Sequence, residues 1–151
     1  MDAAQGSNRA FEIRPARPAD AAALAHLATQ LGYPSSQEQV HQRLASLARD
    51  PEHVVQVAVR DGQVVGWVHA FVCRLLESDP YAEIGGVVVD ESCRGQGAGR
   101  LLLHHVERWA RQKGCRAVSL RCNVLREQAH GFYEGLGYRR IKTQHTFRKE
   151  L

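Results

Sequence analysis

The stretch Glu83–Leu103 constrains the fold of this chain more than any other part of the sequence. It reads as an apolar strand, then a short loop rich in glycine and arginine, then an amphipathic helix that includes Ala98. The first N–H groups of a helix have no intrahelical partner, and the helix dipole favours negative charge at that end. Glycines let a phosphate approach the backbone closely. The stretch therefore predicts a site for a ligand that carries phosphate.

The flanking sequence predicts a mixed α/β domain. The expected elements are a strand at 11–14, helices at 21–31 and 35–49, strands at 54–59 and 64–72, the strand from 83, the helix up to 113, a strand at 117–122, a helix at 127–134 and a last antiparallel pair at 138–141 and 143–147. Ser35 with Glu38 three positions later is a capping-box pattern for the second helix. Asp61 and Gly62 predict a two-residue hairpin turn.

Boundaries follow from the same pattern. Residues 77–80 are polar and are expected to form a loop before the strand from Glu83. Residues 1–10 are predicted to be a flexible tail, and residues 11–151 a single domain. The helix after the glycine loop is expected to present Ala98, Leu101, Leu102, Val106, Trp109 and Ala110 on one apolar face.

Composition excludes several classes of protein. With 151 residues, 44% of them hydrophobic and 24% charged, the chain is long enough and apolar enough to bury its own core. The net charge of +4 comes from scattered arginines with no run of five like charges, so no nucleic-acid partner is predicted. No apolar stretch reaches about 18 residues, which predicts no membrane span, and the polar N-terminus does not resemble a signal peptide.

The four cysteines also indicate the compartment. Cys73, Cys93, Cys115 and Cys122 show neither C-x-x-C spacing nor paired histidines, so neither a metal site nor a disulfide scaffold is predicted. Reduced thiols of this kind are typical of a cytoplasmic protein.

Three families of glycine loop compete for the phosphate site. A P-loop requires Gly-Lys-Ser/Thr, which is absent. A dinucleotide fold requires G-x-G-x-x-G early in the domain, but Gly95, Gly97 and Gly99 run as G-x-G-x-G late in the chain. Ser119 also stands where that fold places an acid. The sequence excludes both families.

The third family fits. The hexamer Arg94–Gly99 matches the [QR]-x-x-G-x-[GA] signature of the GNAT superfamily of acyl-CoA-dependent N-acetyltransferases. The chain also resembles this family in Val87–Asp90, in Asn123 and in Gly131–Tyr138, and the order of elements agrees from residue 11 to 151. The resemblance implies a mixed sheet of about six to seven strands with about four helices, whose splayed central strands hold acetyl-CoA.

The resemblance also implies how the cofactor is held. Backbone N–H groups around Gln96–Arg100 would cradle the pyrophosphate of CoA, and the side chains of Arg94 and Arg100 either add charge there or stay solvated. The implied cofactor-binding residues are Val87, Val88, Val89, Arg94, Gly95, Gln96, Gly97, Ala98, Gly99, Arg100, Asn123 and Tyr133.

The glycine pair Gly85-Gly86 within the strand usually marks a bulge or a close backbone approach. The resemblance implies a bulge that splays this strand from the strand at 117–122 and lets the pantetheine arm pair near Val87–Val89. A freed N–H would then stabilise negative charge on the thioester oxygen.

Two residues are candidates for proton transfer. Tyr133 matches the family's general acid to the CoA sulfur, and a phenol with a pKa of about 10 is protonated at neutral pH. Glu83 matches a family position for the base, with a water chain as the alternative. Strand alternation predicts that Glu83, Gly85 and Val87 point to one side. His130 is expected on the surface, with a cofactor contact or proton transfer as the alternative role.

The predicted activity is transfer of acetyl from acetyl-CoA to a small-molecule or peptide primary amine by direct attack in a ternary complex. Another acyl-CoA, or a CoA-binding sensor without turnover, is the alternative. The family's acceptor cleft corresponds here to the first two helices, the turn Leu31–Pro34, the loop ahead of the Glu83 strand and the loop between the last strands. Glu77, Asp79 and Glu83 either attract a cationic amine or are simply solvated. Aminoglycosides, polyamines, amino acids and protein amines all stay open as acceptors, as does a homodimer.

Overall fold

The computed structural model of this protein describes residues 10–151. They form two compact units, one up to Leu120 and the other Arg121–Leu151. The first unit contains a five-stranded sheet and three α-helices, and the second contains one α-helix. No helix in the described range is both long enough and apolar enough to cross a membrane. The tail predicted at 1–10 lies outside the described residues except for the exposed Ala10.

The sheet of the first unit has its strands in the order of the chain. They are β1 (Glu12–Pro15), β2 (His53–Arg60), β3 (Gln63–Leu75), β4 (Ser78–Val89) and β5 (Val118–Leu120). The pairs from β1 to β4 are antiparallel, and β5 runs parallel to β4. Asp61 and Gly62 join β2 to β3 with positive φ angles of 51° and 75°, which confirms the predicted hairpin turn.

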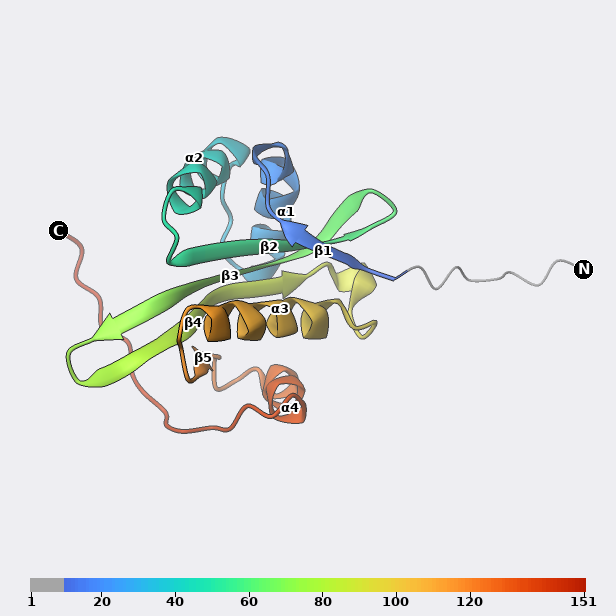
Figure 1. Cartoon of the computed structure of the whole chain (residues 1–151). Coiled ribbons are helices and arrows are strands. Elements are labelled where there is room, and N and C mark those ends of the chain that lie inside the picture. Colours follow the sequence, from blue (N-terminus) through green and yellow to red (C-terminus); the bar gives the residue numbers. More distant parts are fainter. Residues whose placement is uncertain (1–9) are drawn as a thin grey trace, which may run out of the picture. The chain divides into compact units, whose positions relative to one another are not determined.

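Helices cover both faces of this sheet (Figure 1). Helices α1 (Ala21–Leu31) and α2 (Gln37–Ala48) lie on one face, and α3 (Ala98–Gln112) lies on the other. The α1/α2 face buries Leu24, Leu44, Val57 and Val59 together. The α3 face buries Val72, Ala82, Ala110 and Cys115. On α3 itself Leu103 is fully buried and Leu101 is 37% exposed, so the predicted apolar face is displaced at that turn.

The capping box of α2 is one residue later than predicted. Ser36 is the N-cap: its hydroxyl accepts from the backbone N–H of Gln39, and the Gln39 side chain accepts from the Ser36 N–H. Glu38 instead accepts a hydrogen bond from Gln42 one turn later. Ser35 with Glu38 was wrong because the adjacent Ser36 with Gln39 satisfies the same pattern.

A β-bulge interrupts the pairing of β3 with β4. His69 lies opposite Gly86 while Ala70 lies opposite Ile84, so Gly85 is the extra residue. Strand β4 pairs with β5 only over Ala82–Ile84 and then continues to Val89. The bulge therefore lies where the glycine pair predicted it, and the pairing of β4 with β5 ends just before it.

The bulge changes which residues share a face. Glu83 lies opposite Phe71, and Val87 lies opposite Val68. Phe71 and Val68 are three positions apart on β3, so they point to opposite faces, and directly opposed residues share a face. Glu83 and Val87 therefore point to opposite sides of the sheet. The prediction that they share a side is wrong, because the extra residue at Gly85 reverses the alternation.

Two predictions about strand limits are also wrong. Strand β4 begins at Ser78, so residues 78–80 belong to it and not to a loop. The last strand pair does not form, and the sheet in the described residues has five strands instead of six to seven. The segment after Tyr138 is basic, and all of it is exposed, including Ile141 and Phe147. Alternation there lacks the buried face that specifies a strand.

Candidate functional site

The predicted phosphate site lies at the start of α3. A short 3-10 turn, Glu91–Cys93, leads from β4 into the glycine loop. Gly95 and Gly97 have φ angles of 74° and 98°, which side chains other than glycine rarely adopt. Gly97 is the N-cap of α3 and offers no side-chain cap, so the first-turn N–H groups are left to bind another acceptor. A Cβ at either glycine would meet no atom within 4 Å, so the backbone is open to a ligand.

Arginines flank this loop. The Nε of Arg94 donates to the Val89 carbonyl at 3.2 Å, which ties the loop back to β4. Arg60, at the end of β2, donates to the side chain of Gln96 and stacks over Phe11 at 3.8 Å from the ring centroid. Sequence reasoning missed Arg60, because only the sheet brings it next to Gln96, 36 positions later.

Helix α1 is tied to the same loop. The amide nitrogen of Gln30 donates to Asp90 at 3.1 Å, and the Glu91 N–H donates to the Gln30 amide oxygen at 3.1 Å. The hydroxyl and backbone N–H of Ser92 both donate to Asp90. These hydrogen bonds hold the pKa of Asp90 below its usual range, and those from Ser92 contribute most. The end of β4 is therefore fixed by charge-assisted contacts.

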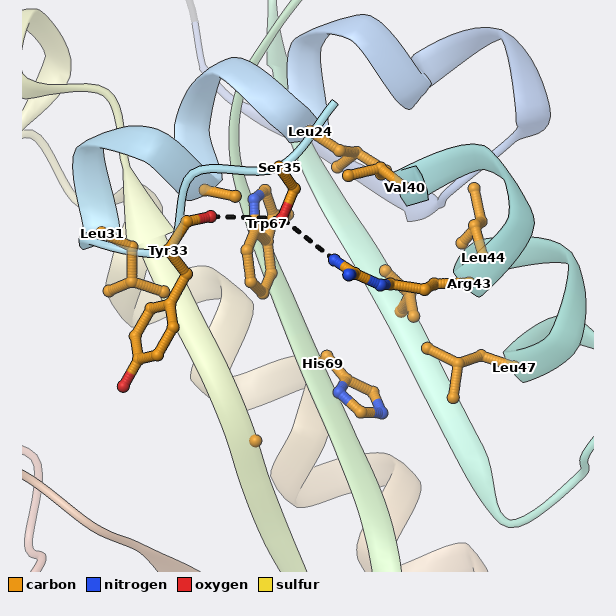
Figure 2. A pocket seen from close by; sticks show the side chains of 13 residues that line it. Leu24, Leu31, Tyr33, Ser35, Val40, Arg43, Leu44, Leu47, Trp67 and His69 are labelled. Carbon is orange, nitrogen blue, oxygen red and sulfur yellow. Dashed lines mark hydrogen bonds between the residues drawn. The ribbon is translucent and has the colours of Figure 1, made fainter. Parts of the chain in front are cut away.

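A cavity of about 340 Å³ opens between α1, α2 and the sheet (Figure 2). Nine of its 13 lining side chains are aliphatic or aromatic, among them Leu24, Leu44 and Trp67. Arg43 is the one lysine or arginine in the lining, and no aspartate or glutamate lines it. The α1–α2 turn was predicted as part of the acceptor cleft, but the strand side chains were not. The bulge residue Gly85 also lines the cavity. The cavity therefore reaches the part of β4 that β5 does not pair with.

His69, on β3, projects into this cavity beside the bulge (Figure 2). A Cβ at Gly85 would lie 2.9 Å from His69 Nδ1, so the imidazole needs a glycine there. His69 Nε2 lies 2.9 Å from His53 Nδ1, and the two rings stack. Burial, and then the charge of His53, lower the pKa of His69 to about 4. His69 is therefore neutral at neutral pH, and no sequence motif marked it.

Glu83 is half-buried on the same face of the sheet as Phe71, but it does not line the cavity. The Tyr81 hydroxyl donates to Glu83 at 3.5 Å. The hydrogen bond with Cys73 contributes most to raising the pKa of Tyr81 to about 12, so this hydroxyl keeps its proton. Glu77 and Asp79 are exposed beside the β3–β4 turn and do not line the cavity either.

The second unit holds the remaining predicted residues. Helix α4 (Glu127–Gly135) carries Tyr133, whose ring packs against Phe132 and Tyr138. Burial, and then the nearby Cys122, raise the pKa of Tyr133 above its usual value, so the phenol is protonated at neutral pH. The neighbouring Phe132 is 41% exposed.

Asn123 and His130 close the turn before α4. The Asn123 side chain accepts from the Leu125 N–H at 2.9 Å, as expected for a turn residue. Its backbone carbonyl lies 2.8 Å from His130 Nε2. His130 is thus half-buried and hydrogen-bonded within its own turn. Within residues 10–151, no three His, Cys, Asp or Glu side chains gather as a metal site would require.

Known proteins resemble this chain over nearly its whole length. Residues 21–138 match the family model described as the acetyltransferase (GNAT) family. An aminoglycoside N(6')-acetyltransferase type 1 from Stenotrophomonas maltophilia is 33% identical over 92% of this chain and 93% of its own. An aminoalkylphosphonate N-acetyltransferase from Salmonella typhimurium is 36% identical over 60% of this chain and 59% of its own. A solved Trypanosoma brucei acetyltransferase superposes with a TM-score of 0.77 at 27% identity, covering 94% and 100% of the two chains.

Proposed function

The chain belongs to the GNAT acetyltransferase family, and we propose that it transfers acetyl from acetyl-CoA to a small primary amine in a ternary complex. One observation carries this proposal. The bulged end of β4, which β5 does not pair with, leads through the glycine loop to the uncapped N-terminus of α3, and the cavity beside α1 and α2 reaches the same bulge. An acyl carrier and an amine can therefore meet at Gly85.

The residues present fit the CoA moiety. Open space at Gly95 and Gly97 and the uncapped N–H groups of α3 suit a pyrophosphate. The backbone of Gly85–Val89, which β5 leaves unpaired, suits the amides of the pantetheine arm. The cofactor-binding residues are Val87, Val88, Val89, Arg94, Gly95, Gln96, Gly97, Ala98, Gly99, Arg100, Asn123 and Tyr133, with Arg60 added from the structure. Acetyl-CoA supplies the acetyl group as an activated thioester.

Side chains handle the protons. An alkylamine has an ordinary pKa of about 10.4 and must lose a proton before it can attack. Glu83 takes that proton, directly or through water, since it lies on the face that carries the cavity. Tyr133 gives a proton to the departing sulfur, and its raised pKa keeps that proton available. A backbone N–H near the bulge stabilises the negative charge that develops on the carbonyl oxygen.

The relatives' names point to different acceptors. One acts on an aminoglycoside, which is polycationic, and the other on an aminoalkylphosphonate, which carries an anionic group. The acceptor of this chain therefore has to be argued from its own cavity.

An acetylation assay tests the proposal. Purified protein is mixed with acetyl-CoA and a panel of amines: an aminoglycoside, a polyamine, amino acids, an aminoalkylphosphonate and a peptide. We expect free thiol release with at least one amine, together with a mass increase of one acetyl group on that amine. Tight CoA binding without turnover on any amine would instead support the sensor.

A further inference from the structure

We propose that the acceptor is a small primary amine with an apolar body and an anionic group, a carboxylate or phosphonate, that pairs with Arg43. This inference rests on the proposed function and specifies its substrate class. It commits the cavity between α1, α2 and the sheet to one kind of occupant.

Charge carries the first step. Arg43 is the sole lysine or arginine in the cavity lining, which contains no aspartate or glutamate. Its guanidinium donates to the Ser35 hydroxyl at 2.9 Å and has no carboxylate partner within residues 10–151 (Figure 2). A polycation would meet a like charge here without an acid to offset it. A carboxylate or phosphonate would instead accept charge-assisted hydrogen bonds from the planar guanidinium.

The apolar lining carries the second step. A volume of about 340 Å³ lies near the lower end of the range for ligand pockets, roughly 300–1,000 Å³, and suits a small molecule. Nine aliphatic or aromatic side chains offer few partners to the hydroxyl groups of an amino sugar. Each hydroxyl buried without a partner would cost about 1–3 kcal/mol. An apolar body avoids that cost.

Trp67 lines the cavity, and its indole holds a donor without a partner. Its Nε1 is buried and has no hydrogen-bond partner among the described residues. Among residues 10–151, the one other buried side-chain nitrogen or oxygen without a hydrogen-bond partner is Arg60 Nε, which lies outside the cavity. A ligand oxygen that reached Trp67 would relieve an unsatisfied donor, and an acidic group brings such oxygens.

The amine end is set by a histidine pair. His53 Nδ1 and His69 Nε2 share a hydrogen bond of 2.9 Å, and Asp50 lies 3.8 Å from His53 Nε2. In the tautomer in which His69 Nε2 is the donor, His69 Nδ1 carries a lone pair beside Gly85. That lone pair accepts a hydrogen bond from an amine N–H. The amine is thereby oriented toward the bulge, and its anionic group toward α2.

Matched pairs of amines test this inference. The pairs are phenylalanine with phenylalanine amide, and 3-aminopropylphosphonate with propylamine; spermidine and an aminoglycoside serve as polycations. We expect kcat/KM to be about 10- to 100-fold higher for the anionic member of a pair, from the ordinary strength of hydrogen bonds to charged groups. Arg43→Gln should lower kcat/KM for the anionic member of each pair to about the value of the member that lacks the anionic group.

Arg49→Gln is the matched control. Arg49 is an exposed arginine at the C-cap of the same helix and does not line the cavity. Circular dichroism confirms that each variant is folded. A higher kcat/KM for the polycations, or an equal loss for both members of a pair in Arg43→Gln, would overturn the inference and leave the acetyltransferase intact. Absence of turnover with every amine would instead remove the proposed function.

Discussion

The two halves of the proposed site are built in different ways. The half for CoA comes mainly from one continuous stretch, Gly85–Arg100, and offers mainly backbone N–H groups. The half for the acceptor comes from α1, α2, β2 and β3, and offers side chains such as Arg43, Trp67 and His69. CoA is the same in every reaction of this kind, and its recognition by backbone groups needs only glycines and a helix N-terminus. A short sequence motif is therefore enough to locate this half. Side chains spread over four elements can change with the substrate, and no motif records them.

The largest expected effect lies at Tyr133, outside the continuous stretch Gly85–Arg100. Tyr133→Phe removes the proton donor, so turnover should fall about 100-fold while acetyl-CoA binding stays within about twofold. Steady-state kinetics and calorimetric titration with CoA measure the two quantities. Tyr138→Phe, in the same aromatic cluster, is the control and should retain turnover. Undiminished turnover in Tyr133→Phe would exclude the acid role.

A substitution at the N-terminus of α3 tests the CoA half most directly. Gly97→Val places a branched side chain at a φ of 98° and in the space meant for the pyrophosphate, so CoA affinity should fall about 30-fold or more. Gly114→Val has a similar positive φ of 80° at the opposite end of α3 and controls for backbone strain. It should lose stability but keep CoA affinity. Equal affinities in the two variants would refute the loop assignment.

A substitution at Gly86, next to the bulge residue Gly85, tests the acceptor half. A Cβ at Gly86 would lie 3.0 Å from two atoms of the Trp67 ring, so Gly86→Ala must displace the indole in the cavity wall. Overpacking of this kind costs about 1–3 kcal/mol, and kcat/KM for the acceptor should fall about 10-fold with CoA affinity nearly unchanged. A loss confined to CoA affinity would show that Gly86 serves CoA through its backbone and that the indole it touches does not shape the acceptor cavity.

Glu83→Gln addresses the proton acceptor between the halves. Removal of the carboxylate should lower kcat about fivefold to tenfold without changing either affinity, and added amine at high pH should recover part of the loss. The pH–rate profiles of wild type and variant measure both the loss of kcat and its partial recovery at high pH. Identical profiles would leave a water chain as the base.

The smallest effect tests the buried histidine. The pKa of His69 is about 4 in the folded chain and near 6.5 when unfolded, so the unfolded chain binds more protons between these values. Stability should therefore fall as the pH drops from 6.5 toward 4, by on the order of 1 kcal/mol after allowance for partial exposure. Urea unfolding at pH 7 and 5 measures it. His69→Gln should flatten the dependence, whereas exposed His104→Gln should leave it.

Local patterns explain what the sequence predicted correctly. The glycine pair predicted the bulge, and the expected helix end at 31 agrees with the end of α1 at Leu31, because each depends on the local backbone. Even so, the bulge reversed the facing of Val87, since alternation was counted through it. The last strand pair failed because the residues after Tyr138 alternate without burying a face.

Long-range contacts explain what was missed. Arg60 reaches Gln96 across the sheet, and His69 reaches Gly85 through the register of β3 with β4. The position of Arg43 in a cavity without an acidic side chain can be recognised only when α2 is packed over β2 and β3. The acceptor half therefore depends on the fold, whereas the CoA half could be located from a hexamer.

Backbone ¹H–¹⁵N chemical-shift mapping tests the division of the site most directly. Titration with CoA should shift the amides of residues 85–101, and later addition of phenylalanine should shift those around the cavity, including Arg43, Trp67 and His69. The account predicts two sets of shifts that overlap only near Gly85. Shifts from the amine that avoid α1 and α2, or from CoA that avoid the start of α3, would contradict it.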